Sequence, residues 1–308
     1  MQDGLLLVDK DPGGTSHDVV QRVRRLLKQK KVGHCGTLDP DATGLLLLTL
    51  GSATRLTRFL IRAPKVYEGT LRLGVTTDTY DATGRVVAEG PTDGLTTEAV
   101  AAAMAGFEGT SEQQPPPYSA KKVGGVKYYE LARRGEEVPQ ETKEVTVYDF
   151  KPLGELSAPE AGGTRSLRFL LSCSSGTYAR SLAHDVGQAL GCGAHLAALR
   201  RTQIGPFTVG SALSHAALEA RLSAGEGPGD AWVPFDQIPL PFGEVTADPQ
   251  QEQRIHHGQT VLVRELAGEE GDWVKLLNRR RELIAVGTVV ERIGAGGVGV
   301  VQPKVVFR

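Results

Sequence analysis

An aspartate-containing turn is the segment of this sequence best suited to chemistry. Residues 33–45 read Gly-His-Cys-Gly-Thr-Leu-Asp-Pro-Asp-Ala-Thr-Gly-Leu, with Asp39 and Asp41 among glycines and a proline, directly before an apolar run. Asp-Pro is a common turn opener, so one interpretation is a tight turn that leads into a buried element. The other is that Asp39 is a catalytic carboxylate carried on that turn. This segment alone leaves both interpretations open.

Two further segments carry side chains that could work with a carboxylate. The stretch from Ser174 to Arg180 is predicted to open a helix directly after a strand, which puts Arg180 in the first helical turn. An arginine there is well placed to meet a carboxylate from elsewhere, to keep it ionised and to aim it. Lys65-Val-Tyr67 lies at the start of a predicted strand, where Tyr67 could offer an aromatic face for stacking.

Hydrophobic spacing predicts the elements that must position these residues. A helix with a basic outer side is predicted to begin with Ser16 as its N-cap. The apolar run at residues 45–50 is a buried element whose type the spacing leaves open. Strands are predicted at residues 66–75, 84–88, 145–150 and 166–173, and further helices over residues 100–107 and 182–190.

Length and composition set the class of protein. The chain has 308 residues, of which 40% are apolar and 23% charged, as expected for a globular protein of two domains. Its apolar runs are too short to span a bilayer, and its first residues lack the features of a secretory signal. The three cysteines, Cys35, Cys173 and Cys192, are odd in number and lack C-x-x-C spacing. They favour a cytoplasmic location and argue against a zinc cluster.

The charge and glycine patterns by themselves do not indicate a ligand. The net charge is −1, although residues 1–65 carry 11 Lys and Arg against 6 Asp and Glu. Six of those bases fall between Arg22 and Lys31, and alone they are interpreted as the solvated face of a helix. Residues 294–299 match G-x-G-x-x-G, but too few residues follow for the helix of a dinucleotide site. No cofactor or metal is therefore predicted.

Five separated stretches in matching order identify a family. The chain resembles the TruB family, the bacterial tRNA pseudouridine-55 synthases, over essentially its whole length. The matching stretches are residues 7–16, 33–45, 65–67 and 116–133, and the segment from Gly176 to Phe207. One departure is visible, because Asp11 stands between the lysine of the first stretch and Pro12, where the family usually has proline directly after the lysine.

The resemblance implies a role for each candidate residue. Asp39 would be the catalytic carboxylate and Arg180 its partner, while Tyr67 would stack on the flipped uracil and help move the C5 proton. Among the substrate-binding residues, Tyr178 and Leu199 would line the pocket and His34 would fill the gap left by the extruded base. Lys10 is the remaining substrate-binding candidate, and a structural position beneath the site is the alternative for it.

The resemblance also implies the architecture. The fold would be α+β, with a pseudouridine-synthase-type mixed, largely antiparallel sheet flanked by helices in residues 1–240. An RNA-gripping insertion is expected at about residues 113–142, with RNA contacts from Lys121, Lys122, Lys127 and Arg133. A small β-barrel domain of the RNA-binding PUA type is expected at residues 241–308, where short β-type runs follow one another closely.

The expected activity is isomerisation of uridine to pseudouridine at position 55 in the T-loop of tRNAs. The expected protein is a cytoplasmic monomer that binds the tRNA T-stem-loop and needs no cofactor, metal or membrane. A non-catalytic RNA-binding protein or tRNA chaperone, and an enzyme that works on guide-RNA-selected sites, are the alternatives. A hydrolase that uses Asp39 with Asp41 is disfavoured, because residues at i and i+2 make a poor acid–base pair across a substrate.

Overall fold

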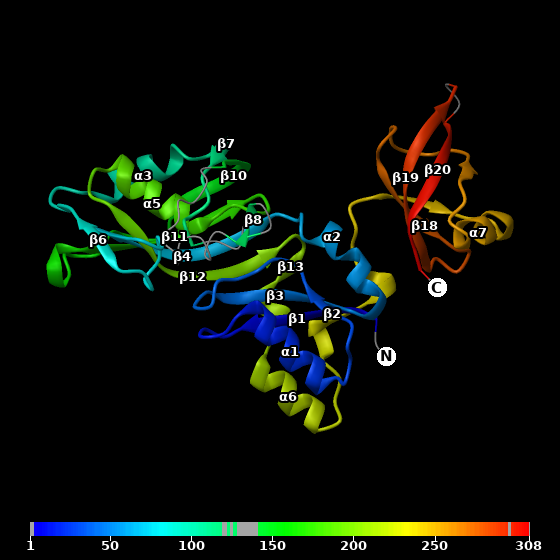
Figure 1. Ribbon diagram of the computed structural model, residues 1–308, viewed down its shortest axis with the longest axis horizontal. Helices are drawn as coiled ribbons and strands as arrows, with labels where there is room; N and C mark the ends of the chain where they lie inside the picture. Colours follow the sequence, from blue (N-terminus) through cyan, green and yellow to red (C-terminus); the bar gives the residue numbers. More distant parts are fainter. Residues whose placement is uncertain (1–2, 119–121, 124–125, 128–140, 295–296, 308) are drawn as a thin grey trace.

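The computed structural model describes residues 3–118, 122–123, 126–127, 141–294 and 297–307. One large mixed sheet forms its centre, in the strand order β14-β1-β3-β12-β4-β11-β10-β7 (Figure 1). In that order the strands are Leu213–Ser214, Gly4–Lys10, Thr43–Leu50, Ala194–Ile204, Lys65–Leu73, Arg165–Cys173, Lys143–Pro152 and Gly109–Gln113. Three short strands pair beside this path: β2 (Val32–His34), β13 (Phe207–Thr208) and β15 (Trp232–Pro234). Only β1–β14 and β3–β12 pair in parallel, so the sheet is largely antiparallel, as expected.

Two pairs of helices flank this sheet (Figure 1). Helices α3 (Thr97–Ala105) and α5 (Ala179–Ala189) pack with β10 and β12, while α1 (Ser16–Leu26) and α6 (His215–Ser223) pack near β1 and β2. The short helix α2 (Thr57–Leu60) precedes β4, and the strands β5 (Val75–Thr77) and β6 (Val86–Glu89) form a separate hairpin. A further two-stranded hairpin consists of β8 (Lys122–Val123) and β9 (Val126–Lys127).

The apolar run that the spacing left open is a strand. Residues 45–48 of β3 are fully buried leucines, which pack in one core with β1 and with Val20 and Val23 of α1. A continuous apolar run suits a strand covered on both faces. Burial of these side chains contributes about 25 cal/mol per Å² of apolar surface removed from water. The Asp39 turn lies between β2 and β3, and β2 pairs with β3, so this buried strand anchors both ends of the turn.

The predicted start of the first helix was wrong by one residue. The N-cap is Thr15, whose hydroxyl accepts from the backbone N–H of Asp18, while Asp18 accepts in return from the Thr15 N–H. This reciprocal pair is a capping box, which satisfies two otherwise free donors. Ser16 is buried instead, and its hydroxyl bonds to the backbone of Leu38. The start of α1 is therefore fastened to the Asp39 turn.

A second, smaller sheet follows toward the C-terminus. Its five strands are ordered β16-β18-β19-β20-β17 and form the curled half-barrel visible at the right of Figure 1, with helix α7 (Pro249–His256) beside them. In that order the strands are Gly243–Thr246, Trp273–Leu277, Leu283–Ile293, Val298–Val306 and Val261–Val263. Phe59 of α2 packs on Trp273 at 4.8 Å between ring centroids, which joins this sheet to the larger one. The α+β fold class is confirmed.

No helix in the part of the chain that the structure describes is long and apolar enough to cross a membrane.

Candidate active site

The turn that carries Asp39 connects β2 to β3 and is stabilised from several sides. Cys35 donates its N–H to the carbonyl of Leu47, at 2.9 Å, and Ala42 donates to the carbonyl of Asp39, at 3.1 Å. The side chain of Asp39 keeps 43% of its surface exposed. A fixed backbone under an accessible carboxylate is the arrangement that a nucleophile on a turn requires.

Lys10 holds this turn from below. Its side chain is 2% exposed, and its ammonium donates to the carbonyls of Pro40 and Ala42, each at 2.7 Å, and to that of Asp11 at 3.0 Å. Burial lowers the pKa of Lys10, and the nearby carboxylate of Asp41 opposes that shift. Three carbonyls use all three donors of the ammonium. Asp11, the departure from the family pattern, takes part through its backbone carbonyl, which any residue at that position would supply.

Arg201, a residue that the sequence reasoning missed, holds the turn from the opposite side. It lies on β12 and is 1% exposed. Its guanidinium donates to the carbonyls of Leu45 at 2.7 Å, Gly36 at 3.0 Å and Thr37 at 3.4 Å. A buried arginine is tolerable only when its donors are satisfied, and here backbone carbonyls satisfy them. The only sequence signal was its place in a matched stretch, directly after Leu199-Arg200.

Gly44 permits the close approach of β3 to β12. Its φ is +99°, and a Cβ built there would lie 2.2 Å from the carbonyl oxygen of Arg201. A side chain would therefore meet both an unfavourable backbone conformation and immovable backbone atoms. The end of the Asp39 turn requires glycine for this reason.

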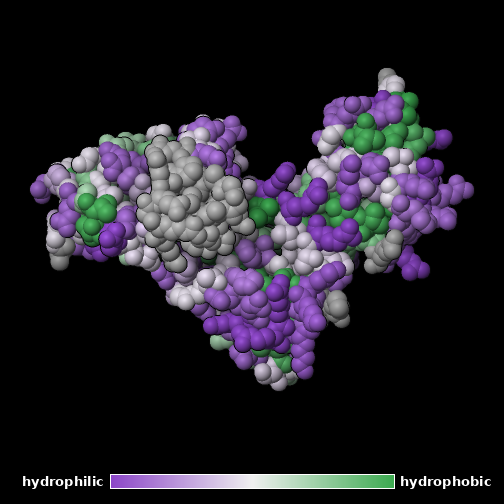
Figure 2. All heavy atoms as spheres, viewed as in Figure 1, coloured by the Kyte–Doolittle hydropathy of each residue, from purple (hydrophilic) through white to green (hydrophobic). Residues whose placement is uncertain are grey.

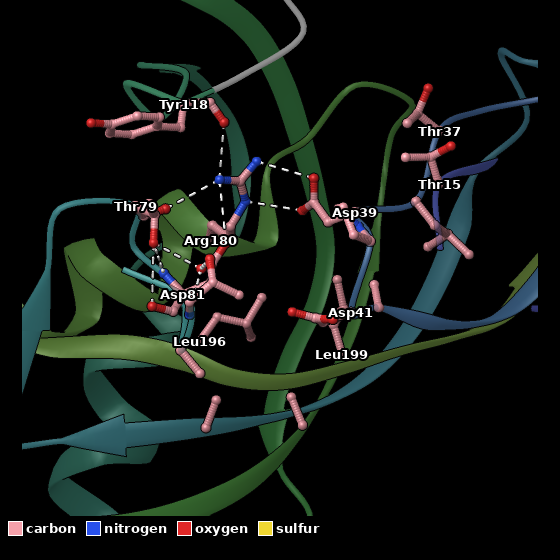
Figure 3. Close-up of a pocket in the computed structure, with 17 residues that line it drawn as sticks. Thr15, Thr37, Asp39, Asp41, Thr79, Asp81, Tyr118, Arg180, Leu196 and Leu199 are labelled. Carbon is pink, nitrogen blue, oxygen red and sulfur yellow. Dashed lines mark hydrogen bonds and ion pairs between the residues drawn. The ribbon is translucent and has the colours of Figure 1, made fainter. Parts of the chain in front are cut away.

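Arg180 meets Asp39 across the sheet. It lies in the first turn of α5, with 7% of its side chain exposed. Its Nε lies 3.0 Å from Oδ2 of Asp39, and its Nη2 donates to Oδ1 at 3.2 Å. This two-point contact combines one hydrogen bond, from Nη2, with one ion-pair contact, from Nε, which has no hydrogen-bond partner among the described residues. Together the two contacts hold the carboxylate beside the guanidinium. Figure 3 shows the pair facing each other inside the pocket.

A second carboxylate shares the same arginine. Asp81 Oδ2 lies 3.5 Å from Nη1 of Arg180, and the same nitrogen donates to the carbonyls of Thr79 and Tyr118 at 3.1 Å each (Figure 3). Oδ1 of Asp81 accepts from Thr83 and Thr79, which closes a turn. The sequence Asp81-Ala-Thr-Gly84 repeats Asp41-Ala-Thr-Gly44 and would suggest turn chemistry only. That repeat was the signal that could have pointed to Asp81.

The Asp39–Arg180 pair separates two adjoining cavities. The first, of about 820 Å³, is lined by Asp39, Arg180 and Leu199 together with Thr15 and Asp81. The second, of about 430 Å³, shares Asp39, Arg180 and Leu199 and adds the side chains of Lys65, Tyr67, Lys143, Tyr178 and Arg201. A charged pair on the wall that two cavities share is suited to orienting a ligand.

Tyr67 and Lys65 lie side by side on β4 in the second cavity. Burial raises the pKa of the Tyr67 phenol, and Arg201 partly opposes the shift, so the phenol is neutral at pH 7. Burial lowers the pKa of Lys65 to about 8. The Lys65 ammonium donates to the carbonyls of Ala63, at 2.6 Å, and Ile61. The base of this cavity is therefore polar but carries few free donors.

Five of the seven predicted catalytic and substrate-binding residues line these cavities: Asp39, Tyr67, Tyr178, Arg180 and Leu199. The other two predicted residues, Lys10 and His34, line neither cavity. His34 ends β2, burial lowers its pKa, and its Nδ1 is buried without a hydrogen-bond partner in the described part of the protein.

Two of the four predicted RNA-contact residues lie within the described positions. Lys121 and Arg133 lie outside the described residues. The backbones of Lys122 and Lys127 pair in register on the β8–β9 hairpin. Among the residues that the structure describes, no group of three or more His, Cys, Asp or Glu side chains could hold a metal ion.

Comparison with known proteins gives one consistent family. Residues 24–179 match the family described as "TruB family pseudouridylate synthase (N terminal domain)", and residues 180–231 match "tRNA pseudouridylate synthase B C-terminal domain". A protein of Solibacter usitatus named tRNA pseudouridine synthase B is 43% identical over 94% of this chain and 96% of its own length. One of Ralstonia pickettii with the same name is 42% identical over 98% of this chain and 93% of its own.

Solved structures agree with the sequence relatives. The chain superposes on one in "Crystal Structure of a Cbf5-Nop10-Gar1 Complex" with a TM-score of 0.72 and 28% identity, covering 99% of this chain and 85% of that one. A structure titled "Structure of H/ACA RNP bound to a substrate RNA containing 2'-deoxyuridine" gives the same TM-score at 26% identity, covering 100% of this chain and 86% of that chain.

Proposed function

Because this chain belongs to the TruB family of pseudouridine synthases and isomerises uridine in tRNA, we propose that its target is position 55 in the T-loop. We propose Asp39 as the catalytic carboxylate and Arg180 as the group that orients it. The observation that supports both is the two-point contact of these side chains on the wall shared by two cavities.

The reaction needs one nucleophile and two proton transfers. Asp39 attacks the target nucleotide, which lets the N1–C1′ bond of uridine break while the uracil stays in the pocket. The ring then rotates and C5 bonds to C1′, and the bond between Asp39 and the nucleotide breaks, which frees the carboxylate. C5 loses its proton to water, and N1 gains one. Atoms and electrons balance within the nucleotide, so the reaction needs no cofactor or metal.

The target base must leave the stack to reach Asp39. Flipping a nucleotide out of a folded RNA loop costs a few kcal/mol. A stacking aromatic side chain returns about 1–3 kcal/mol, and Tyr67 is proposed as that platform. Its phenol, neutral because burial raises its pKa, lies in the same cavity as Asp39 and can assist the C5 proton. Tyr178 and Leu199 line the pocket around the uracil.

Lys10 and His34 act away from the uracil in this proposal. Lys10 reaches the carbonyls on either side of Asp41, so it positions the Asp39 turn from beneath. His34 occupies the space that the extruded base leaves in the loop. Its buried, unpartnered Nδ1 and lowered pKa support a neutral imidazole, which could fill an RNA stack without the cost of burying a charge.

The RNA is held outside the pocket by two further parts. The insertion at about residues 113–142 grips the T-stem-loop through Lys121, Lys122, Lys127 and Arg133. The C-terminal sheet serves as the PUA-type RNA-binding domain. The enzyme is proposed to act as a monomer in the cytoplasm.

Release of tritium from RNA labelled at uridine C5 tests this function, because the C5 proton is lost to water when the new bond forms. A T-stem-loop RNA would be incubated with the wild-type protein and with the Asp39→Asn variant. The proposal expects release by the wild type and its loss in the variant, with RNA affinity retained.

Two controls test the target position in the RNA and the alternative function. A stem-loop with cytidine at position 55 and label in its other uridines should release no tritium, and release from it would contradict the assignment of the site. Tight binding without release by the wild type would instead indicate a non-catalytic tRNA chaperone.

A further inference from the structure

The exposed side of α1, together with the segment that follows it, forms a basic surface beside the cavity of Asp39. Its members, defined here as the α1 face, are Arg22, Arg25, Lys28, Lys30 and Lys31, all exposed. Hydrophilic side chains cover this region in Figure 2. We propose that the α1 face binds the sugar–phosphate backbone of the substrate tRNA outside the T-stem-loop. This inference rests on the proposed function.

The helix begins at the rim of the site. Thr15, its N-cap, lines the cavity that contains Asp39, and Ser16 bonds to Leu38 of the Asp39 turn. A helix rises about 1.5 Å per residue, so Arg22 lies roughly 10 Å from the rim and Arg25 roughly 15 Å. RNA whose target base occupies the cavity therefore passes within reach of these side chains.

Within the described residues the positive charge of the α1 face is largely unneutralised, although the Asp18 carboxylate interacts with the charge of Arg22. Across the described ranges, none of its five side chains forms a salt bridge. Asp18, the acid on the same helix, is held by the capping box, and Glu226 of the neighbouring segment pairs with Arg221 at 3.2 Å. Unpaired, solvent-facing bases of this kind are suited to phosphates.

Stabilisation of the helix end does not account for the whole face. Arg25 lies in the last turn of α1, where a cation compensates the helix dipole. Lys30 and Lys31 lie beyond the helix, and Arg22 lies a full turn before its end. Arg24 points inward and donates to the carbonyl of Val32 at 2.8 Å. Arg24 therefore has a structural role, whereas Arg22 and Arg25 remain exposed to solvent.

Nucleic acid suits this face better than a membrane does. Every fully exposed residue of α1 is polar: His17, Asp18, Gln21, Arg22 and Arg25. A helix that lies in a membrane needs an apolar side to insert, and here the apolar side is buried in the protein core.

The described ends of the insertion reach both cavities, since Tyr118 lines the first and Lys143, just after the insertion, lines the second. Thr15 lines the first cavity as well, and α1 runs on from it to Leu26. Because Arg22 and Arg25 lie two to three turns along α1 from this rim, they are placed to contact RNA that lies beyond the T-stem-loop.

Paired affinities for two RNAs test the proposal. The full chain would be titrated with a complete tRNA and with the isolated T-stem-loop, over a range of salt concentrations. The double variant R22E/R25E should bind tRNA about tenfold more weakly, and the slope of log K against log salt should fall by roughly 1–2. Its affinity for the stem-loop should not change.

The charge-keeping variant R22K/R25K is the matched control and should retain tRNA affinity. Equal weakening for both RNAs, or an unchanged salt slope for tRNA in R22E/R25E, would overturn the proposal. Unfolding midpoints of both variants reveal a merely structural effect, which would lower the midpoint without an RNA-specific loss and would also overturn it. Failure of the wild type to release tritium from either RNA would refute the proposed function instead.

Discussion

Arg180 and Asp39 contact each other although 141 positions separate them in the chain. The arginine is nearly buried and the aspartate is half-exposed, so the side-on contact lies at the boundary between protein and solvent. Nη1 of Arg180 is simultaneously held by the carbonyls of Thr79 and Tyr118. The guanidinium is therefore fixed before any substrate arrives, and it fixes the carboxylate in turn.

Replacement of Arg180 by lysine should abolish most of the activity. An ammonium keeps the charge but cannot make the two-point contact with Asp39 while it also satisfies the two carbonyls. We expect the single-turnover rate of tritium release to fall about 100-fold, since small misplacements of a reacting group cost this much. The matched control is Arg168→Lys, because Arg168 pairs with Glu68 on the exposed surface. Similar rates for both variants would contradict the orienting role.

Replacement of Lys10 by methionine should separate a positioning role from direct substrate binding. The variant removes the Lys10 donor of the Ala42 carbonyl, whereas the Pro40 carbonyl still accepts from the N–H of Gly13, and the loss should cost about 1–3 kcal/mol of stability. Because Lys10 does not line the cavity, we expect kcat to fall and KM to stay nearly constant. Lys304→Met, at an exposed position, should change neither. A raised KM with unchanged kcat would indicate that Lys10 contacts the RNA itself.

Gly44 and Gly154 allow strain and collision to be measured separately. Their φ values are +99° and +100°, but only the Cβ at Gly44 would collide with backbone, whereas no atom lies within 4 Å at Gly154. Gly154→Ala should therefore cost about 1–2 kcal/mol, the penalty for this conformation alone. Gly44→Ala should cost at least about 3 kcal/mol, because overpacking adds to that penalty. Urea unfolding of both variants gives the comparison, and equal costs would contradict the close approach of β3 and β12.

Asp185 of α5 should make the stability depend on pH. Burial raises its pKa from 3.8 to about 6 in the folded protein. The folded state therefore binds more protons than the unfolded state between these values, and stability decreases as the pH rises through them.

Asp185→Asn removes this effect. The variant should match the wild type below pH 3.8 and exceed its stability by about 1–2 kcal/mol above pH 6, after allowance for solvent screening. Unfolding free energies measured from pH 3.5 to 8 provide the test. Glu89→Gln, at an exposed position, is the control and should show no such pH dependence. A constant difference between Asp185→Asn and the wild type would refute the burial of charge.

Much of the molecule was predictable because its signals are local. Hydrophobic spacing predicted several of the helices and strands, but it missed β1 and β12 in the large sheet. The ordered motifs predicted the family and the α+β fold. Where two neighbouring residues could both cap a helix, the predicted helix start was wrong by one residue. Ser16 was a plausible N-cap, but Thr15 takes that position because the Asp18 carboxylate completes the capping box and Ser16 bonds to Leu38 instead.

The contacts that make the site could not be read from spacing. Asp81 looked like a turn residue, and it is one, yet its other oxygen reaches Arg180. Arg201 resembled any charged residue of a motif, and only the fold reveals that it is buried and satisfied by carbonyls of the Asp39 turn.

The sequence by itself determined which residue types were available and which local elements would carry them. Tertiary structure decided which of them meet, because the order of β3, β12, β4 and β11 sets the distance between turns that are remote in the chain. Lys10 illustrates the difference: its type allowed a substrate contact, but its position beneath Pro40 and Ala42 directs all three of its donors to the backbone. Local propensities act over a few residues, whereas the pairing of a buried charge depends on the whole packed core.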